Sequence, residues 1–144
     1  MAVDLKEFKF HQDTLEDFTV KLVDSEHELD IWVNTVISGF QINGELDEMY
    51  KIILTDSGFK FPIKNYLGFF KGEAVATACC FFFAGVVGVY WVSTLAAYRE
   101  KGIGCHMMNA ILNDALSGGD RVTILQSSVQ GLSMYQKLGF SEFC

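Results

Sequence analysis

The spacing of hydrophobic positions changes several times along the chain, and each change indicates a new element. Residues 18–23 alternate polar and apolar side chains, which predicts a strand. Apolar residues then recur at helical spacing up to about Gly39. Ser25 and Glu28 precede them in the S-x-x-E pattern of a capping box, in which the two side chains satisfy free amides at a helix start. We therefore expect a strand followed by a capped helix.

The middle of the chain predicts a short helix and then an antiparallel meander. Apolar side chains share one face of a helix over residues 45–54, and Gly58 follows it. Three strand-like runs come next, separated by Lys-Gly and Ala-Gly turns; they are residues 65–70, 74–83 and 86–95. The second run is nearly continuous in apolar residues, so we expect it to be covered on both faces.

The last part of the chain predicts a loop, a helix, a strand and a final helix. Apolar residues at helical spacing begin after Gly104 and end before Gly118. Residues 121–127 are rich in β-branched side chains, and a short helix is expected over residues 132–138. The full order, β, α, α, β, β, β, α, β, α, predicts one mixed α/β domain over residues 1–144, with helices covering a partly antiparallel sheet.

Composition and charge exclude several classes of protein. Of the 144 residues, 50% are hydrophobic, 14% are aromatic and one is proline, which excludes a disordered or collagen-like chain. Eleven Lys and Arg stand against 18 Asp and Glu, for a formal net charge of −7. We therefore expect no nucleic-acid partner, whereas a cationic substrate would be attracted. No run reaches the ~18 apolar residues of a membrane-spanning helix, so no membrane partner is expected.

The cysteines and histidines form neither a metal-binding nor a disulfide pattern. Cys79, Cys80, Cys105 and Cys144 contain no C-x-x-C pair and follow no secretory signal. We expect them to be reduced thiols that pack as small hydrophobic side chains in a cytoplasmic protein. The three histidines are scattered singly, without the spacing of metal ligands, so no metal site is expected.

The segment with the most chemical information runs from Arg99 to Gly104 and reads Arg-Glu-Lys-Gly-Ile-Gly. Its glycines allow a tight turn and the close approach of a ligand, and the helix that follows presents free amides and a positive dipole end. Arg99 and Lys101 place positive charge beside these amides in an otherwise acidic protein. The pattern indicates an anion-binding loop. A plain strand-to-helix turn with two solvated bases fits the same spacing.

Two segments resemble motifs of the GNAT superfamily of N-acetyltransferases. Residues 88–104, Gly-Val-Tyr-Trp-Val-Ser-Thr-Leu-Ala-Ala-Tyr-Arg-Glu-Lys-Gly-Ile-Gly, resemble its central motif and fit its Arg/Gln-x-x-Gly-x-Gly/Ala loop. Residues 132–140, Leu-Ser-Met-Tyr-Gln-Lys-Leu-Gly-Phe, resemble its final helix, where a tyrosine precedes Leu-Gly-Phe. The resemblance implies a mostly antiparallel sheet with helices on both faces, in which the parallel strands 86–95 and 121–127 part to admit acetyl-CoA.

The resemblance also implies which residues bind acetyl-CoA. The backbone of Val92, Ser93 and Thr94 is expected to pair with the pantetheine arm. The loop is expected to hold the pyrophosphate on its amides; its residues are Arg99, Glu100, Lys101, Gly102, Ile103 and Gly104. Glu100 stands where many relatives have glycine, and its carboxylate is expected to point to solvent. Ser128 stands where many members have an asparagine that bonds the pantetheine, and its hydroxyl is able to donate the same bond.

Tyr135 is expected to contact the cofactor and to be the catalytic residue. Direct attack of an amine on the acetyl thioester expels a thiolate, which a phenol near the sulfur is able to protonate as general acid. The alternative is that Tyr135 only supplies the aromatic body of a short amphipathic helix. No carboxylate lies on strand 86–95, so the base would be a water chain or one of three acids that otherwise suit a helix start: Glu45, Asp47 and Glu48.

Together these features predict an acetyl-CoA-dependent N-acetyltransferase acting on a primary amine of a small molecule or peptide. The alternative is a catalytically weak acyl-CoA-binding module of the same fold. Relatives usually continue for another strand or two after Leu-Gly-Phe, so we expect the sheet to lack its last strands and the edge of strand 121–127 to be exposed. We further expect a homodimer that buries this edge or the region Phe81-Phe82-Phe83.

Overall fold

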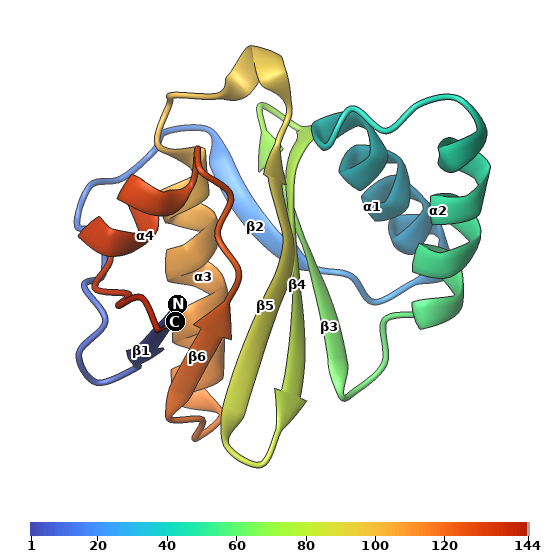
Figure 1. Ribbon diagram of the computed structural model, residues 1–144. Coiled ribbons are helices and arrows are strands. Elements are labelled where there is room, and N and C mark those ends of the chain that lie inside the picture. The colour runs from blue at the N-terminus through green and yellow to red at the C-terminus, as the bar shows by residue number, and fades with distance from the viewer. Residues whose placement is uncertain (144) are drawn as a thin grey trace.

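The computed structural model describes residues 1–143 and arranges them as one six-stranded sheet with helices on both faces (Figure 1). In chain order the elements are β1 (Ala2–Asp4), β2 (Phe18–Leu22), α1 (Glu26–Gly39), α2 (Glu45–Ser57), β3 (Ile63–Phe70), β4 (Glu73–Phe83), β5 (Val86–Thr94), the 3-10 helix η1 (Ala96–Tyr98), α3 (Ile103–Ser117), β6 (Val122–Leu125) and α4 (Leu132–Lys137). The strand order is β1-β6-β5-β4-β3-β2, and all neighbours are antiparallel except β5 and β6. The predicted mixed α/β fold is confirmed.

The two faces of the sheet have separate apolar cores. On the face covered by α1 and α2, Trp32 is buried and its Nε1 donates a hydrogen bond to Ala78 O of β4 at 3.1 Å. On the face covered by α3 and α4, Met107 and Ile111 of α3 are buried together with Val87 of β5. The central strand β4 is therefore covered on both faces, as its apolar run predicts. No helix within residues 1–143 has both the length and the apolar character to cross a membrane.

The serine half of the capping box at the start of α1 forms as predicted, whereas the glutamate bonds the residue before the N-cap. Ser25 Oγ accepts the amide of Glu28 at 3.2 Å, and Glu28 Oε2 accepts the amide of Asp24 at 3.0 Å. Lys21 of β2 pairs with the same carboxylate, and its hydrogen bond lowers the pKa of Glu28 to about 2. At the other end of α1, a Cβ added to Gly39 would lie 2.4 Å from an atom of β5, Ser93 Oγ. The helix therefore ends in close contact with β5.

The outer edge of β6 is paired, which corrects the expectation that it is exposed. β1 forms an antiparallel ladder with β6 in which Ala2 lies opposite Ile124. The amide of Leu5 extends this contact by donating to Arg121 O at 2.8 Å. A strand of three residues carries no readable period, which is why the sequence did not predict it. The argument for a homodimer at this edge is therefore removed.

The described cysteines and the phenylalanines of the β4–β5 hairpin differ in how far they are buried. Cys79, Cys80 and Cys105 are free, and burial raises the pKa of each thiol. Cys144, the fourth cysteine of the sequence, lies outside the described residues. In the region proposed as a dimer contact, Phe82 is buried, whereas its two neighbours, Phe81 and Phe83, are exposed.

Candidate functional site

β5 and β6 run side by side and then part. Their parallel register extends from Val86 opposite Val122 to Val89 opposite Leu125. β6 ends there, whereas β5 continues to Thr94. In Figure 1, β5 leads on to η1 and the chain after β6 leads to α4. Among residues 1–143, no strand pairs with the β6-facing backbone groups in the last part of β5, and the two strands part as the resemblance implies.

A β-bulge turns β5 at the point where the two strands part. The register between β4 and β5 shifts by one residue here, and Trp91 takes a left-handed φ of +52°. Such a conformation costs a non-glycine residue roughly 1–3 kcal/mol. The indole packs edge-on against Phe40 and Tyr50, with ring centroids 5.5 and 5.9 Å away. This aromatic packing holds the bulge, which increases the local twist of β5.

The segment predicted to bind pantetheine follows the bulge directly. Leu95 donates its amide to Val75 O of β4 at 2.8 Å. Because successive residues of a strand direct their backbone groups to opposite sides, those of Thr94 and Val92 face away from β4, toward the opening. The Ser93 hydroxyl is hydrogen-bonded to a threonine of β4. The structure therefore brings the backbone of Val92 and Thr94 to the opening, whereas the Ser93 side chain contacts β4.

Arg99 binds carbonyl groups of the chain itself. Its Nε donates to Thr94 O at 3.0 Å, and its Nη2 donates to Gly39 O at 2.9 Å. The guanidinium thereby joins the end of β5 to the end of α1. Since this bond occupies the carbonyl of Thr94, the amide of Thr94 and the backbone of Val92 are the groups left for a ligand. The sequence predicted the position of Arg99 in the loop but not this bridging contact.

The loop between η1 and α3 has the geometry of an anion-binding site. Gly102 takes a φ of +79° immediately before α3, and Glu100 takes a φ of +62°. Among residues 1–143, no acceptor binds the amides of the four residues that begin the helix: Gly102, Ile103, Gly104 and Cys105. α3 is 15 residues long, so a full helix dipole adds a positive end at these amides.

The two glycines of the loop have different structural roles. A Cβ added at Gly102 would meet nothing nearer than His106 Cδ2 at 3.9 Å, so this position needs glycine for its φ, and the space beside it is open. At Gly104 an added Cβ would lie 2.8 Å from Met134 Sδ, so here glycine allows α4 to pack closely. Ile103 between them is 2% exposed and anchors the turn in the core.

Lys101 adds positive charge at this loop. Its Nζ lies 5.9 Å from the ring centroid of Phe70 and 5.4 Å from that of Tyr98. Cation–π contacts at an exposed site hold an ammonium group only loosely, so Lys101 is free to move toward a phosphate. Glu100 is exposed as well, in agreement with the expectation that it points to solvent.

Tyr135 lies on α4 and is 7% exposed. Its ring packs edge-on against Phe140, with centroids 5.7 Å apart, and the ring edge lies 2.9 Å from where a Cβ of Gly131 would be. Burial raises the pKa of its hydroxyl to about 12. The phenol is therefore protonated at neutral pH and lies beside the loop that follows β6.

Ser128 shapes that loop. Its Oγ accepts the amide of Gly131 at 3.2 Å, and its carbonyl accepts the hydroxyl of Ser127 at 2.7 Å and the amide of Leu132 at 3.1 Å. The Ser128 hydroxyl oxygen thus acts as an acceptor. Its proton remains available for the donor role that the resemblance implies.

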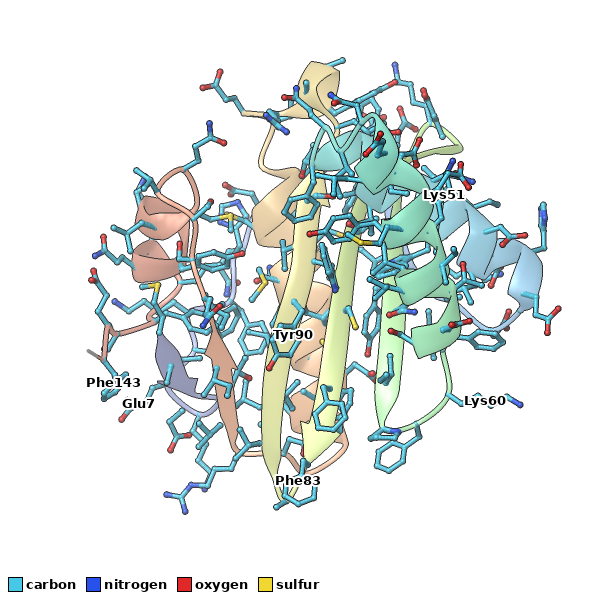
Figure 2. All side chains as sticks on the ribbon, turned by 45° about the vertical axis from the view of Figure 1, so that its right-hand side comes forward. Glu7, Lys51, Lys60, Phe83, Tyr90 and Phe143 are labelled. Carbon is cyan, nitrogen blue, oxygen red and sulfur yellow. The ribbon has the colours of Figure 1, made fainter. Side chains whose placement is uncertain are left out.

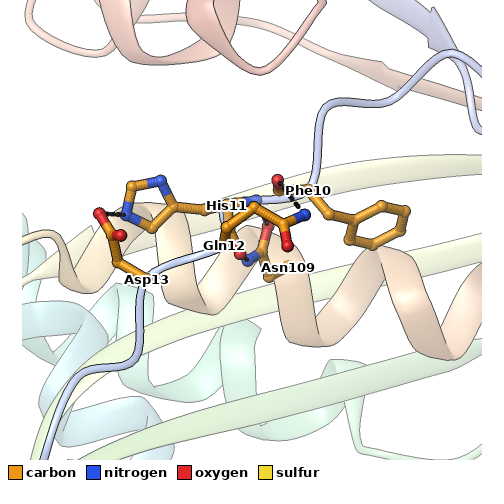
Figure 3. Close-up of polar contacts among 5 residues, drawn as sticks. All are labelled: Phe10, His11, Gln12, Asp13 and Asn109. Carbon is orange, nitrogen blue, oxygen red and sulfur yellow. Dashed lines mark hydrogen bonds and ion pairs between the residues drawn. The ribbon is translucent and has the colours of Figure 1, made fainter.

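Two histidines, His11 and His106, lie near the loop between η1 and α3, and the sequence analysis missed this pair. The ring of His106, on the first turn of α3, lies 5.3 Å from that of His11. The backbone of His11 pairs with the Asn109 side chain of α3 at 3.0 and 2.8 Å, and the His11 Nε2 lies 3.4 Å from Asp13 Oδ2; Figure 3 draws these contacts. Burial, with a contribution from His11, lowers the pKa of His106. Within residues 1–143, no three His, Cys, Asp or Glu side chains gather closely enough to hold a metal ion.

Two cavities lie on the α1–α2 face, and Tyr90 lines both. Figure 2 shows Tyr90 on β5, on this side of the sheet. The larger cavity, about 400 Å³, is bordered by β1, β5 and β6. The smaller, about 260 Å³, is bordered by α1, α2, β3, β4 and β5. Because Tyr90 follows Val89, the last residue of β5 paired with β6, both cavities adjoin the start of the opening.

The three acids considered as a catalytic base line neither cavity. Asp47 Oδ1 and Glu48 Oε1 lie 3.1 and 3.2 Å from Lys51 Nζ on the same helix. Glu45 is exposed in the first turn of α2. Glu45 and Glu48 are exposed, as is typical of a solvated helix start, whereas Asp47 Oδ1 is buried.

Solved acetyltransferase structures share this fold. A GCN5-related N-acetyltransferase from Kribbella flavida matches 97% of this chain with a TM-score of 0.71 at 20% identity, and the chain spans 52% of that protein. A protein from Clostridium acetobutylicum, described as a predicted acetyltransferase with acetyl-CoA, has a TM-score of 0.70 at 17% identity over 88% of this chain and 91% of its own. The aminoglycoside N-acetyltransferase AAC(6')-Iy, in complex with CoA, has a TM-score of 0.69 at 15% identity over 87% and 88%.

A family comparison is more specific than these likenesses of fold. No curated protein sequence matches the chain. The acetyltransferase (GNAT) domain, however, matches residues 64–142, which is more than half of the chain. That stretch includes the parted strands, the loop before α3 and Tyr135. The chain therefore belongs to the GNAT acetyltransferase family.

Proposed function

We propose that this chain binds acetyl-CoA in the opening between β5 and β6 and transfers the acetyl group directly to a primary amine of a small molecule or peptide. The observation that carries the proposal is the row of free amides at the start of α3, which follows the strand that parts from its neighbour. Membership of the GNAT family supports it. The CoA-bound structure of AAC(6')-Iy, which has the same fold, supports the cofactor.

The backbone of the chain supplies the binding groups. The amides from Gly102 to Cys105 hold the pyrophosphate at the positive end of α3, and Lys101 adds a mobile positive charge. The open side of Gly102 leaves room for the phosphate oxygens. Val92 and Thr94 orient the pantetheine arm through the backbone groups that lack a partner strand.

Tyr135 supplies the chemical group that the reaction needs at the sulfur. Acetyl-CoA, when bound, provides an activated thioester whose C–S bond breaks as the new C–N bond forms. The Tyr135 hydroxyl, with a pKa near 12, stays protonated and donates a hydrogen bond to the departing sulfur. Because an ordinary thiol has a pKa of about 8.5, this donation stabilises the thiolate without requiring complete proton transfer. Since no carboxylate lines the two cavities, water takes the proton from the attacking amine.

Replacing Tyr135 by phenylalanine tests this mechanism. Tyr135→Phe retains the ring that packs on Phe140 and removes only the hydroxyl. We expect kcat to fall by about 100-fold or more, with the Kd for CoA within about two-fold of the wild type. The control is Tyr66→Phe, which removes a hydroxyl bonded to Asp114, outside the site; this variant loses stability but keeps its kcat.

Thiol release from acetyl-CoA is the assay, with amines, amino acids, polyamines and peptides as acceptors. The proposal requires that at least one class accelerates release by the wild type. Binding of CoA without acceleration by any amine would contradict transfer and would identify an acyl-CoA-binding module. Absence of any thermal shift with CoA would contradict cofactor binding itself.

A further inference from the structure

The larger cavity on the α1–α2 face lies where β5 and β6 part. Its volume is about 400 Å³, and it is lined by Tyr90 of β5 and by Leu125 of β6. Val89, directly before Tyr90, lies opposite Leu125 in the last pair of the parallel ladder. The cavity therefore begins at the residues from which the two strands separate.

The walls of this cavity are mostly apolar, and none of the residues that line it has a charged side chain. Besides Tyr90 and Leu125, they include Ala2, Ile124, Gln126 and Phe143. The α-amino group of Met1, at the same place, donates to Leu125 O at 2.8 Å. Ile124, Tyr90 and Phe143 are exposed around the cavity. Apolar side chains that are exposed together, unlike single ones, mark a binding surface.

A glycine of β5 determines where the Tyr90 ring lies. A Cβ added at Gly88 would lie 2.8 Å from Tyr90 Cε2 and 2.9 Å from the Tyr90 hydroxyl oxygen. The ring therefore folds back along β5 over Gly88, away from the end of the strand that contains Val92 and Thr94. It lies over the part of β5 that is paired with β6 and leaves the start of the opening uncovered.

The order of groups along β5 directs the thioester end of the cofactor toward this cavity. In the proposed function, the amides at the start of α3 hold the pyrophosphate, and the backbone of Thr94 and Val92 orients the pantetheine arm. The thioester is the end of that arm remote from the pyrophosphate, so it lies beyond Val92, on the side of Tyr90. The acyl group is thereby brought next to the cavity.

The chemistry of the walls favours a hydrocarbon chain over an amine. An ammonium group that leaves water needs a carboxylate or several acceptors, and no carboxylate lines the cavity. The polar side-chain groups that line it are the Tyr90 hydroxyl and the Gln126 amide, both on exposed residues. A hydrocarbon chain needs no partner, and each methylene group that leaves water strengthens its binding.

The volume indicates the length of that hydrocarbon chain. A cavity of about 150 Å³ in another protein binds benzene, a molecule of six carbons. A space of about 400 Å³ is more than twice as large, so the single methyl group of an acetyl leaves most of it empty. A linear acyl group of roughly six to eight carbons occupies it well.

We propose that this cavity binds the hydrocarbon chain of a medium-chain acyl-CoA, so that the protein binds acyl donors of about six to eight carbons more tightly than acetyl-CoA. The hydrocarbon chain packs between Ile124 and Phe143, and the Tyr90 ring borders it on β5. This inference rests on the proposed function and names the class of acyl donor at that same site.

Calorimetry with CoA, acetyl-CoA, hexanoyl-CoA and dodecanoyl-CoA, without an amine and below micelle-forming concentrations, tests the cavity directly. Complete burial of one methylene tightens binding by about 4-fold, so four more methylenes in a partly exposed cavity should make hexanoyl-CoA bind about 10-fold or more tightly than acetyl-CoA. Dodecanoyl-CoA should gain less than about 3-fold further, because the cavity is then full. Equal affinities for acetyl-CoA and hexanoyl-CoA would overturn the proposal. An affinity that rises by the same factor per methylene up to dodecanoyl-CoA would also overturn it, because it would show adsorption to the surface.

Filling the cavity locates the hydrocarbon chain. Ile124→Trp places a large ring in the wall and is expected to remove the roughly 10-fold advantage of hexanoyl-CoA over acetyl-CoA, with the Kd for CoA itself within about two-fold of the wild type. Leu22→Trp is the matched control: Leu22 is 41% exposed on β2, at the other edge of the sheet, and Ile124 is 43% exposed. This control should keep the full advantage.

A second variant removes a wall without a risk to folding. Phe143 is 72% exposed, so Phe143→Ala should fold normally and reduce the advantage of hexanoyl-CoA by about 3-fold. Phe83→Ala is its control, because Phe83 is 73% exposed and lines neither cavity. Phe143→Ala carries the test if Ile124→Trp fails to fold. An undiminished advantage in either folded cavity variant would overturn the proposal.

Failure of this inference is distinguishable from failure of the proposed function. CoA alone tests the cofactor site, and the acyl series tests the cavity. A protein that releases thiol from acetyl-CoA with an amine, but binds hexanoyl-CoA no more tightly than acetyl-CoA, retains the proposed function and overturns the acyl cavity. A protein that binds hexanoyl-CoA more tightly through the cavity, but releases no thiol from any thioester with any amine, overturns the transfer and retains the cavity.

Discussion

β5 borders a candidate site on each face of the sheet, and the two sites are built from different parts of the chain. On the α3 face, the site consists of backbone groups that are contiguous in the sequence, from Arg99 to Cys105. On the α1–α2 face, the smaller cavity consists of side chains from five elements, from Trp32 to Trp91. Every residue except proline carries a backbone N–H, so the first site depends on the φ angles that orient these amides. The second depends on which side chains the fold brings together.

This difference explains why one site has a sequence motif and the other has none. A backbone site needs glycine where φ is positive, and Gly102 meets that need at a fixed place before the helix. A side-chain cavity imposes no fixed spacing on residues such as Asn65 and Trp32. The comparison therefore predicts that the two sites respond independently to substitution.

The largest expected effect comes from Gly102→Ala. Alanine at a φ of +79° destabilises the protein by about 1 kcal/mol, and relief of that strain turns the loop amides away from their present directions. We expect the affinity for CoA, measured by calorimetry, to fall by about 10-fold. The smaller cavity on the α1–α2 face should be unaffected, because no residue of this loop lines it.

Gly44→Ala is the matched control for this variant. Gly44 has a φ of +70° before α2, and nothing lies within 4 Å of an added Cβ. Its ψ of −143° lies outside the left-handed helical region of Gly102, so alanine introduces at least as much strain here; thermal stability should fall while CoA affinity is retained. Equal losses of CoA affinity in the two variants would show a general effect of stability and not a property of the loop.

A smaller effect is expected from Arg99→Met, which breaks a contact joining the two faces. The variant removes the hydrogen bonds to Gly39 O and Thr94 O, one of them partly buried. We expect urea unfolding to show a loss of about 1 kcal/mol, and the affinity for CoA to fall by about 3-fold, since the proposed CoA site borders on β5. Arg121→Met removes the same charge at an exposed position and should change neither the stability nor the affinity for CoA. A large loss of CoA affinity at unchanged stability would mean that Arg99 contacts the phosphate directly.

The smallest effect concerns His106, which belongs to the α3 face alone. Burial and His11 lower its pKa in the folded protein, while the unfolded chain keeps a value of about 6.5. As the pH falls through that value the unfolded chain binds the proton first, so this contribution to stability is present above it and is lost below it. Between about pH 7.5 and pH 5.5, the Tm of the wild type should therefore fall more than the Tm of His106→Gln. His27→Gln, at an exposed position on α1, is the reference, and parallel Tm profiles of wild type and His106→Gln would refute the prediction.

Features with local signals could be predicted from the sequence. Ser25 and Glu28 predicted the start of α1 because a capping box acts within one turn. The loop at Gly102 could be predicted because the φ requirement belongs to one residue. The resemblance added the segment from Val92 to Thr94, together with Tyr135; the structure has Val92 and Thr94 at the opening between β5 and β6, and Tyr135 on α4 beside the loop that follows β6.

Features that depend on tertiary approach could not be predicted. The bond from Arg99 to Gly39 exists only because α1 ends against β5. His11 meets His106 because the N-terminal segment packs along α3. The unpartnered oxygen of Asn65 depends on Gly58 taking the other end of the amide. None of these contacts leaves a periodic trace in the sequence.

The pairing of β1 with β6 also determines at which stage of folding the sheet is completed. Ala2 lies opposite Ile124, so this ladder joins segments separated by most of the chain. Closing so long a loop has a large entropic cost, and non-local strand pairs slow folding. During synthesis β1 leaves the ribosome before the other five strands and stays without a partner until β6 follows. The proposed CoA site is therefore expected to form late in folding, when β6 has both of its neighbours.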